Sequence, residues 1–285
     1  MTIIFDGLAA GMLLFLISVG LSVTLGLMNF VNLAHGSFAM LGGYTCALLL
    51  SRLGLPFLLA VPVATAAAAL AGVILERTLY RRLYAASHLD QVLFSIGLIF
   101  MSISAAHYFF GATQQPIVLP EFLKGQINLP GVDIGIYRLF LIVVGLVLAW
   151  GLQWMVSHTR FGAELRAAVD NPRAARGLGI NVDRVFTLTF ALGSGLAGLG
   201  GALGIEMLGL DPGFPVKYIV YFLIVVAVGG SGNIKGSLLA SLMLGVFDVA
   251  GKYYLPQVGA FVIYAVMVVM LIVRPQGLFG RTAAK

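Results

Sequence analysis

Polar side chains interrupt a stretch, residues 28–44, that otherwise reads as membrane-spanning helix. Asn29, Asn32, His35 and Ser37 place two amides, an imidazole and a hydroxyl there. Polar groups at membrane depth must be satisfied by protein or must line a water-filled cavity. Amide, hydroxyl and backbone groups suit a polar neutral or zwitterionic solute better than an ion. The run therefore predicts a wall of a translocation pathway, although His35 equally fits the role of holding a broken helix in shape.

A second polar segment, residues 229–237, echoes the first: an Asn, an apolar residue, a basic residue, Gly, Ser and then a new apolar helix. Transporters often contain internal repeats, but a match this short fits chance equally well. The candidate pathway residues from these segments and from the glycine-rich segment below are Asn29, Asn32, His35, Gly36, Ser37, Gly42, Gly43, Ser194, Gly230, Ser231 and Asn233.

Residues 193–198 match the GxGxxG dinucleotide fingerprint literally. That fingerprint requires a preceding strand and a βαβ unit, whereas this match lies inside an apolar helix, so nucleotide binding is rejected. The small residues instead form two stripes, Gly193/Ala197/Gly201 and Ser194/Gly198/Ala202. Such stripes let membrane helices approach closely, which makes packing the main prediction and a pathway wall the alternative.

Several chemistries have no support in the sequence. No GxxxxGK[ST] phosphate loop is present, and no cluster of His, Cys and Asp has metal-ligand spacing. No row of charged residues through the spans indicates a proton relay or voltage sensor. We therefore expect no catalytic residue, no metal and no cofactor in this chain.

Composition assigns the class. The 285 residues are 60% hydrophobic and 10% charged, with a mean hydropathy of +1.02, whereas soluble domains carry about 25% charged residues. The chain is predicted to be a single all-α polytopic membrane domain over 1–285, with about eight to ten spans. The net charge of +6 is attributed to basic loops, not to nucleic-acid binding.

A span needs roughly 20 mostly apolar residues, and nine candidates are found. They are 7–28, 37–51, 55–75, 91–110, 138–157, 186–208, 218–230, 237–254 and 258–274. The second and seventh are short and lie beside polar segments, which predicts discontinuous helices. With the N-terminus outside, twelve of the 17 Lys and Arg residues fall inside, as the positive-inside rule requires. The segment 111–137 is then a periplasmic loop.

The inward loop 158–184, called the coupling loop below, predicts two short helices. Phe161, Leu165, Ala168 and Val169 recur at helical spacing and share one face. Asn171 followed by Pro172 is a favourable N-cap and first-turn pair, and glycines 177 and 179 end the second helix. The pair fits either an interfacial helix on lipid head groups or a docking knob for a cytoplasmic partner.

These segments together resemble the smaller of the two paired permeases of ATP-binding-cassette importers for branched-chain amino acids. The matching residues are Asn29, Asn32, His35, Gly36 and 42–44; Arg160, Gly162, Arg166, Ala167, 178–181 and 183–185; and Gly229, Gly230, Gly232, Gly236, Pro275, Gly277 and Leu278. The resemblance covers nearly the whole chain and implies the importer permease fold in the inner membrane.

The resemblance also implies partners: a second permease, two cytoplasmic ATPase subunits and a periplasmic binding protein. It places the ATPase contact in the coupling loop, at Arg160, Phe161, Gly162, Leu165, Arg166, Val169, Asp170, Asn171, Pro172, Ala175, Leu178 and Gly179. We expect Asp at positions 165 and 169 to abolish ATPase association.

The segment 170–172 is more acidic than expected for the amino-acid members, and relatives that carry urea, short amides or aromatic acids share the motifs. The solute is therefore a branched-chain amino acid or a related small molecule. An ion-coupled secondary transporter or channel is the alternative, although mid-membrane carboxylates are scarce. An intramembrane enzyme using His35 would need a paired acid or nucleophile that the motif lacks.

Overall fold

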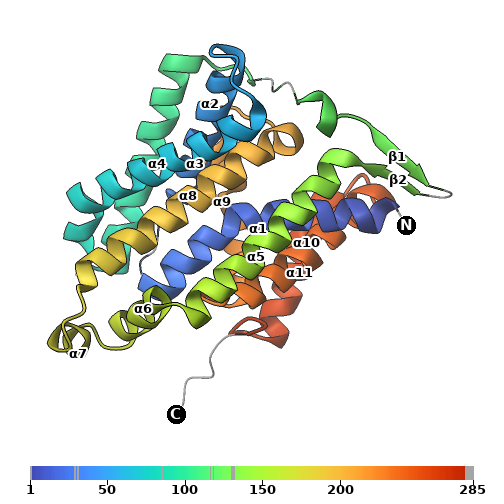
Figure 1. The fold of residues 1–285 in the computed structure, drawn as a ribbon. Helices are drawn as coiled ribbons and strands as arrows, with labels where there is room; N and C mark the ends of the chain where they lie inside the picture. The colour runs from blue at the N-terminus through green and yellow to red at the C-terminus, as the bar shows by residue number, and fades with distance from the viewer. Residues whose placement is uncertain are drawn as a thin grey trace.

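The computed structural model describes residues 2–28, 30, 32–84, 86–115, 117, 119–129 and 132–279. These residues form a bundle of eleven α-helices with one short β-hairpin (Figure 1). The helices are α1 (Thr2–Met28), α2 (His35–Ser51), α3 (Phe57–Thr78), α4 (His88–Phe110), α5 (Ile136–His158), α6 (Arg160–Asp170), α7 (Pro172–Gly177), α8 (Val182–Leu208), α9 (Phe214–Gly229), α10 (Ile234–Tyr254) and α11 (Gly259–Val273). Two 3₁₀ turns, η1 (Tyr80–Leu83) and η2 (Glu121–Leu123), follow α3 and precede the hairpin.

Each of the nine predicted spans coincides with a helix. Six of them, α1, α3, α4, α5, α8 and α10, are long and apolar enough to cross a bilayer. Helices α2, α9 and α11 have 17, 16 and 15 residues. At about 1.5 Å per residue such helices are shorter than the roughly 30 Å hydrocarbon core. The prediction of short second and seventh helices is confirmed, and α11 is a third.

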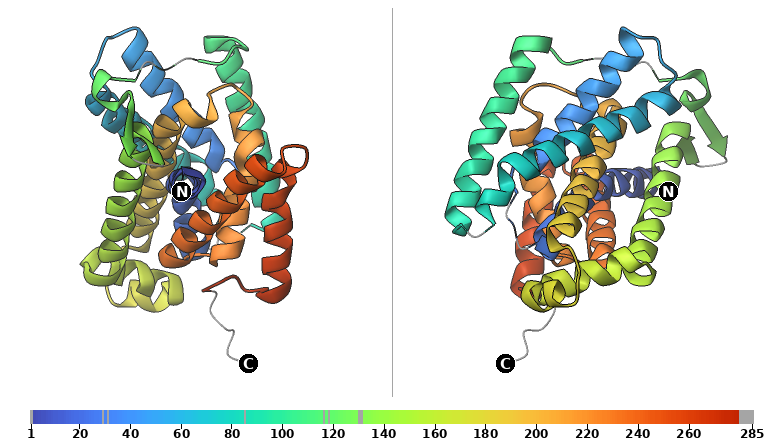
Figure 2. Two further views of the ribbon diagram at one scale, coloured as in Figure 1. Left: turned by 90° about the vertical axis from the view of Figure 1, so that its right-hand side faces the viewer. Right: turned by 60° about the vertical axis from the view of Figure 1, so that its left-hand side comes forward.

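Helices α1 and α8 form the centre of the bundle. Helix α1 packs mainly against α10 and α8, and α8 packs against α3 and α2; Figure 2 shows α1 running through the interior. Most residues of α3, α4 and α5 are at least partly exposed, and their outward side chains, such as Leu70, Phe100 and Trp150, are apolar. A polytopic membrane protein presents such surfaces to lipid or to partner helices.

Small residues allow the central helices to touch. A methyl group added to Gly42 on α2 would collide with the Gly198 carbonyl on α8, and one added to Gly201 would collide with the Ala39 carbonyl. One added to Gly198 would meet the Ala68 side chain on α3. The predicted packing role of the small-residue stripes in α8 is therefore confirmed.

The two ends of the bundle differ. The start of α1, the hairpin and the turns 209–213 and 255–258 lie at what we call the hairpin end, while α6 and α7 lie at the coupling end (Figure 1). The segment 111–137, predicted as a periplasmic loop, contains η2 and the antiparallel strands β1 (Gln126–Leu129) and β2 (Val132–Gly135). An ion pair between Asp6 and Arg138 ties the start of α1 to the start of α5.

Candidate functional site

The first polar run is largely a structural joint between α1 and α2. His35 is buried, and its Nε2 donates to the carbonyl of Ile17 at 2.8 Å, so the ring braces the start of α2 against the middle of α1. Asn32 is also buried and accepts a hydrogen bond from the Tyr80 hydroxyl at 2.9 Å. Asn29 lies outside the described residues. Of the two roles open to His35, the contacts support that of holding the broken helix in shape.

Most small residues predicted for the pathway lie in helix contacts. Gly36 faces the backbone of Pro215, and Gly43 faces the side chain of Leu210; Gly42 meets α8 as described above. Ser194 is buried against Gly72, and its hydroxyl donates to the Phe190 carbonyl at 2.8 Å. Within one chain these side chains do not line an open wall, because the packing of α2, α3, α8 and the α9 start covers them.

Ser37 differs from the other predicted pathway residues of α2 because it borders a cavity. Its hydroxyl lies 2.7 Å from that of Ser102 on α4. The two residues line an apolar cavity of about 280 Å³ between α2, α3 and α4.

The second polar segment forms the turn between α9 and α10. Gly230 has a φ of 89°, a left-handed conformation that glycine adopts without strain. The Asn233 side chain caps α10 by accepting from the Gly236 amide at 3.0 Å. Ser231 and Asn233 line a cavity of about 500 Å³ together with Arg166 of α6. The structure thus brings this segment beside the coupling loop.

The coupling loop folds into the predicted pair of helices. Thr159 caps α6 by accepting from the Gly162 amide at 3.2 Å, and Asn171 caps α7 by accepting from the Ala174 amide at 3.0 Å. Pro172 opens α7. Gly162 packs against the Val156 carbonyl, where no side chain fits, so the corner between α5 and α6 is tight.

The apolar face of this pair is turned inward. Leu165, only 1% exposed, forms a buried cluster with Ala168, Ala175, Val182 and Val185. Phe161 and Val169 pack on its edge. The expectation that Leu165 and Ala175 face an ATPase is wrong for this conformation, because α8 and the pair itself cover them. Asp at position 165 would therefore disrupt the chain's own packing first.

The surface left open at the coupling end has a different composition. Leu178, just beyond α7, is 81% exposed, whereas the other large apolar side chains of the coupling loop are buried or only partly exposed. Exposed polar and small residues surround it in sequence. We define the coupling surface as Arg160, Asn171, Pro172, Arg173, Arg176, Leu178 and Gly179, all of which are exposed. Arg166 and Asp170 are also exposed, and the Arg166 guanidinium donates to the Val156 carbonyl.

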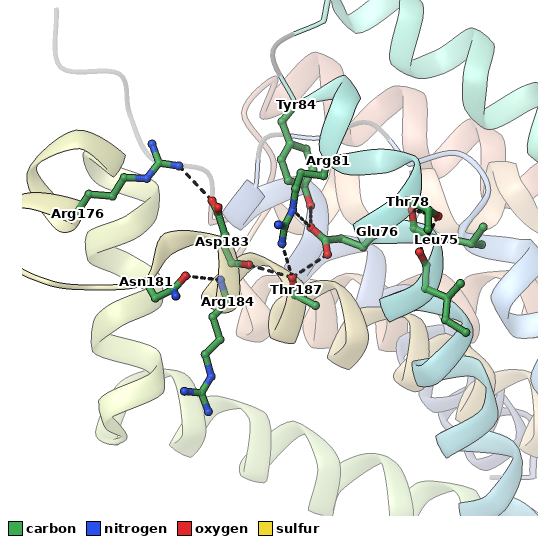
Figure 3. Close-up of polar contacts among 11 residues, drawn as sticks. Leu75, Glu76, Thr78, Arg81, Tyr84, Arg176, Asn181, Asp183, Arg184 and Thr187 are labelled. Atoms are coloured by element: carbon green, nitrogen blue, oxygen red, sulfur yellow. Dashed lines mark hydrogen bonds and ion pairs between the residues drawn. The ribbon is translucent and has the colours of Figure 1, made fainter.

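A buried carboxylate joins α3 to α8 directly behind the coupling loop (Figure 3). Glu76, which is fully buried, accepts from the Tyr84 hydroxyl at 2.9 Å and from the Thr187 hydroxyl at 2.7 Å. Arg81 lies 3.5 Å from the carboxylate and donates to Thr187 at 3.1 Å. We call these four residues the carboxylate cluster. A buried charge costs free energy unless it is paired and hydrogen-bonded, and this arrangement meets both conditions.

The carboxylate cluster continues toward α7. Thr187 also lies 2.9 Å from the Asp183 carbonyl, and the Asp183 side chain binds Arg176 at 3.2 Å (Figure 3). Burial, followed by the neighbouring Glu76 charge, raises the pKa of Tyr84 above its ordinary value, so the phenol stays protonated and keeps donating. Glu76 lies one residue beyond the predicted span 55–75 and is not among the site residues predicted from the sequence.

The chain matches the model of one known protein family over nearly its whole length. Residues 3–271 match the model of the branched-chain amino acid transport system permease component family. The chain belongs to this family. It is therefore an ABC transporter permease with several membrane-spanning helices, and its relatives are transport subunits and not catalytic enzymes.

Relatives in this family match the chain over nearly its whole length. It is 28% identical to the high-affinity branched-chain amino acid transport system permease protein BraD of Pseudomonas aeruginosa, covering 97% of this chain and 94% of BraD. It is 27% identical to LivH of Escherichia coli K12, with the same coverage. A probable LivH of Methanocaldococcus jannaschii is 27% identical over 94% of this chain and 89% of its own length. No solved structure matches the chain significantly.

Proposed function

We propose that this chain is one of two permeases of an ATP-binding-cassette importer in the inner membrane, with the N-terminus in the periplasm and the coupling end in the cytoplasm. The complete importer would also contain a second permease, two ATPase subunits and a periplasmic binding protein. The observation that supports this most directly is the family match over residues 3–271 in a chain whose capped helix pair carries an exposed Leu178.

The coupling surface is proposed to dock on the ATPase. A force on Leu178 and its neighbours would reach α8 through the buried cluster around Leu165. From α8 it would reach α3 through the bonds of Thr187 and Arg81 to Glu76. Because α8 also packs tightly on α2 at Gly42, the helices behind the coupling loop would move together.

The proposed solute is a branched-chain amino acid or a related small zwitterion, as the names of the relatives suggest. The pathway would form between this chain and the second permease. Ser37, Ser231 and Asn233 are the predicted pathway residues that border cavities in this chain, and they are our first candidates for lining that pathway.

The test is reconstitution of both permeases with both ATPase subunits in proteoliposomes, with the binding protein added and leucine uptake as the readout. We expect uptake only when the ATPase, ATP and the binding protein are all present. An ion gradient should not replace ATP, since gradient-driven uptake without the ATPase belongs to a secondary transporter. Leucine uptake that persists after the ATPase is omitted would contradict the proposal.

A further inference from the structure

A cavity of about 480 Å³ opens at the hairpin end, among α1, α8, α9, α10 and α11. Its polar lining is Lys217, Tyr218, Tyr221, Asp248, Lys252 and Tyr264. Leu13 of α1 and Met207 of α8 contribute to an apolar wall. Small-molecule sites combine mostly apolar walls with a few placed polar groups, in volumes of roughly 300–1,000 Å³. This cavity has both properties and carries charges of both signs.

Asp248 is the inner charge of the cavity. The residue is only 8% exposed, and its Oδ2 accepts from the Lys252 ammonium at 2.6 Å. Its Oδ1 is buried and has no hydrogen-bond partner among the described residues. Buried polar atoms are nearly always hydrogen-bonded, and a carboxylate oxygen is an acceptor only. The free oxygen therefore calls for a donor, and an ammonium group is the best match to its charge.

The positive charges lie at the mouth. The side chains of Lys217 and Lys252 are both more than half exposed. Lys217 stands over the Tyr218 ring and lies 3.9 Å from Asp211, a loose pair. The cavity thus has a buried acceptor inside and two partly exposed ammonium groups at its mouth. An α-amino acid has the complementary order of charges when its ammonium enters first.

We propose that this cavity binds a zwitterionic amino acid, with its ammonium on Asp248, its carboxylate between Lys252 and Lys217, and its side chain against Leu13 and Met207. The inference rests on the proposed importer function and names a site for its solute. Lys252 would leave Asp248 and take the carboxylate, so that one ion pair becomes two. Because a zwitterion is neutral overall, this exchange brings no net charge into the helix bundle.

The experiment measures equilibrium binding of radiolabelled leucine to the purified complex of both permeases and both ATPases, without the binding protein. Asp248→Asn should weaken leucine binding about 10- to 150-fold, as expected for a lost hydrogen bond to a charged group. Asp133→Asn makes the same chemical change at an exposed hairpin position and should leave binding unchanged.

Two leucine analogues separate this role from a purely structural ion pair. 4-Methylpentanoate lacks the ammonium, and 3-methylbutylamine lacks the carboxylate. Asp248→Asn should remove the preference for leucine over 4-methylpentanoate, and Lys252→Met should remove the preference over 3-methylbutylamine. A structural pair would make the two variants behave alike, with selectivity intact, and that result would overturn the site.

The outcomes distinguish the site from the function it serves. If the wild-type complex shows ATP-dependent leucine uptake but Asp248→Asn binds leucine with wild-type affinity, the site is wrong and the importer function stands. If the wild-type complex neither binds leucine nor hydrolyses ATP in response to it and the binding protein, both the site and the proposed solute fail.

Discussion

Shortening Leu178 should weaken ATPase binding without weakening the fold. Leu178→Ala removes three carbon atoms, which are worth about 2.4 kcal/mol when buried, at about 0.8 kcal/mol each. The side chain is 81% exposed in the chain alone, so about 2 kcal/mol of that burial is available to a partner. We therefore expect the dissociation constant for the ATPase to rise about 25-fold.

The assay titrates a fluorescently labelled ATPase onto the paired permeases in nanodiscs. Leu53→Ala is the matched control, because Leu53 is 63% exposed in the turn before α3 at the hairpin end. Both variants should unfold thermally at the wild-type temperature. A Leu178→Ala dissociation constant within twofold of wild type would refute the assignment of the coupling surface.

The remaining predictions concern the interior. Leu165→Ala should lower the free energy of unfolding by about 2–5 kcal/mol, because the leucine fills a closed cluster; unchanged chemical denaturation would contradict that packing. Gly198→Ala should cost about 1–3 kcal/mol through overpacking against Ala68, and a wild-type melting temperature would show that α3 and α8 can separate. Tyr84→Phe should cost about 1.5–3 kcal/mol by removing a donor to the Glu76 carboxylate. Since the Tyr84 pKa is raised in the folded state, this contribution is complete below about pH 10 and declines only at higher pH, so denaturation at pH 6 and pH 9 should give equal losses.

Most of the helices could be predicted from local sequence patterns. Hydropathy located nine of the helices, because an apolar run of about 20 residues is typical of a membrane span; six of these are long and apolar enough to cross a bilayer. The predicted cap at Asn171 is short-range as well, since its side chain bonds an amide three residues ahead. Periodicity also found the apolar face of α6, yet it could not say what covers that face. The pattern fitted either a lipid surface or a docking partner, and the family resemblance placed Leu165 at the ATPase contact, whereas the chain's own α8 and α7 bury Leu165.

The features that could not be predicted from the sequence depend on hydrogen bonds between residues far apart in the chain. The carboxylate of Glu76 accepts a hydrogen bond from Thr187, which lies 111 residues later in the chain. No residue close to Glu76 in sequence indicates that this bond forms. The only local signal was a glutamate at the edge of an apolar run, followed by Arg81 and Tyr84. Asn32 is similar, since its acceptor role depends on Tyr80, 48 residues away. The polar residues of the run 28–44 were therefore predicted to line a pathway, because the sequence does not show which other residues of the chain they bond.

The central position of α1 has a consequence for biogenesis. Helix α1 is made early but packs against α10, and residues 29–233 separate the two. At about 5–20 residues per second, α10 follows roughly 10–40 s later. During that interval the surface of α1 that will meet α10, including Gly7, Gly11 and Ser22, has no native neighbour there. The nascent chain therefore depends on lipid or an insertion factor to shield its future core.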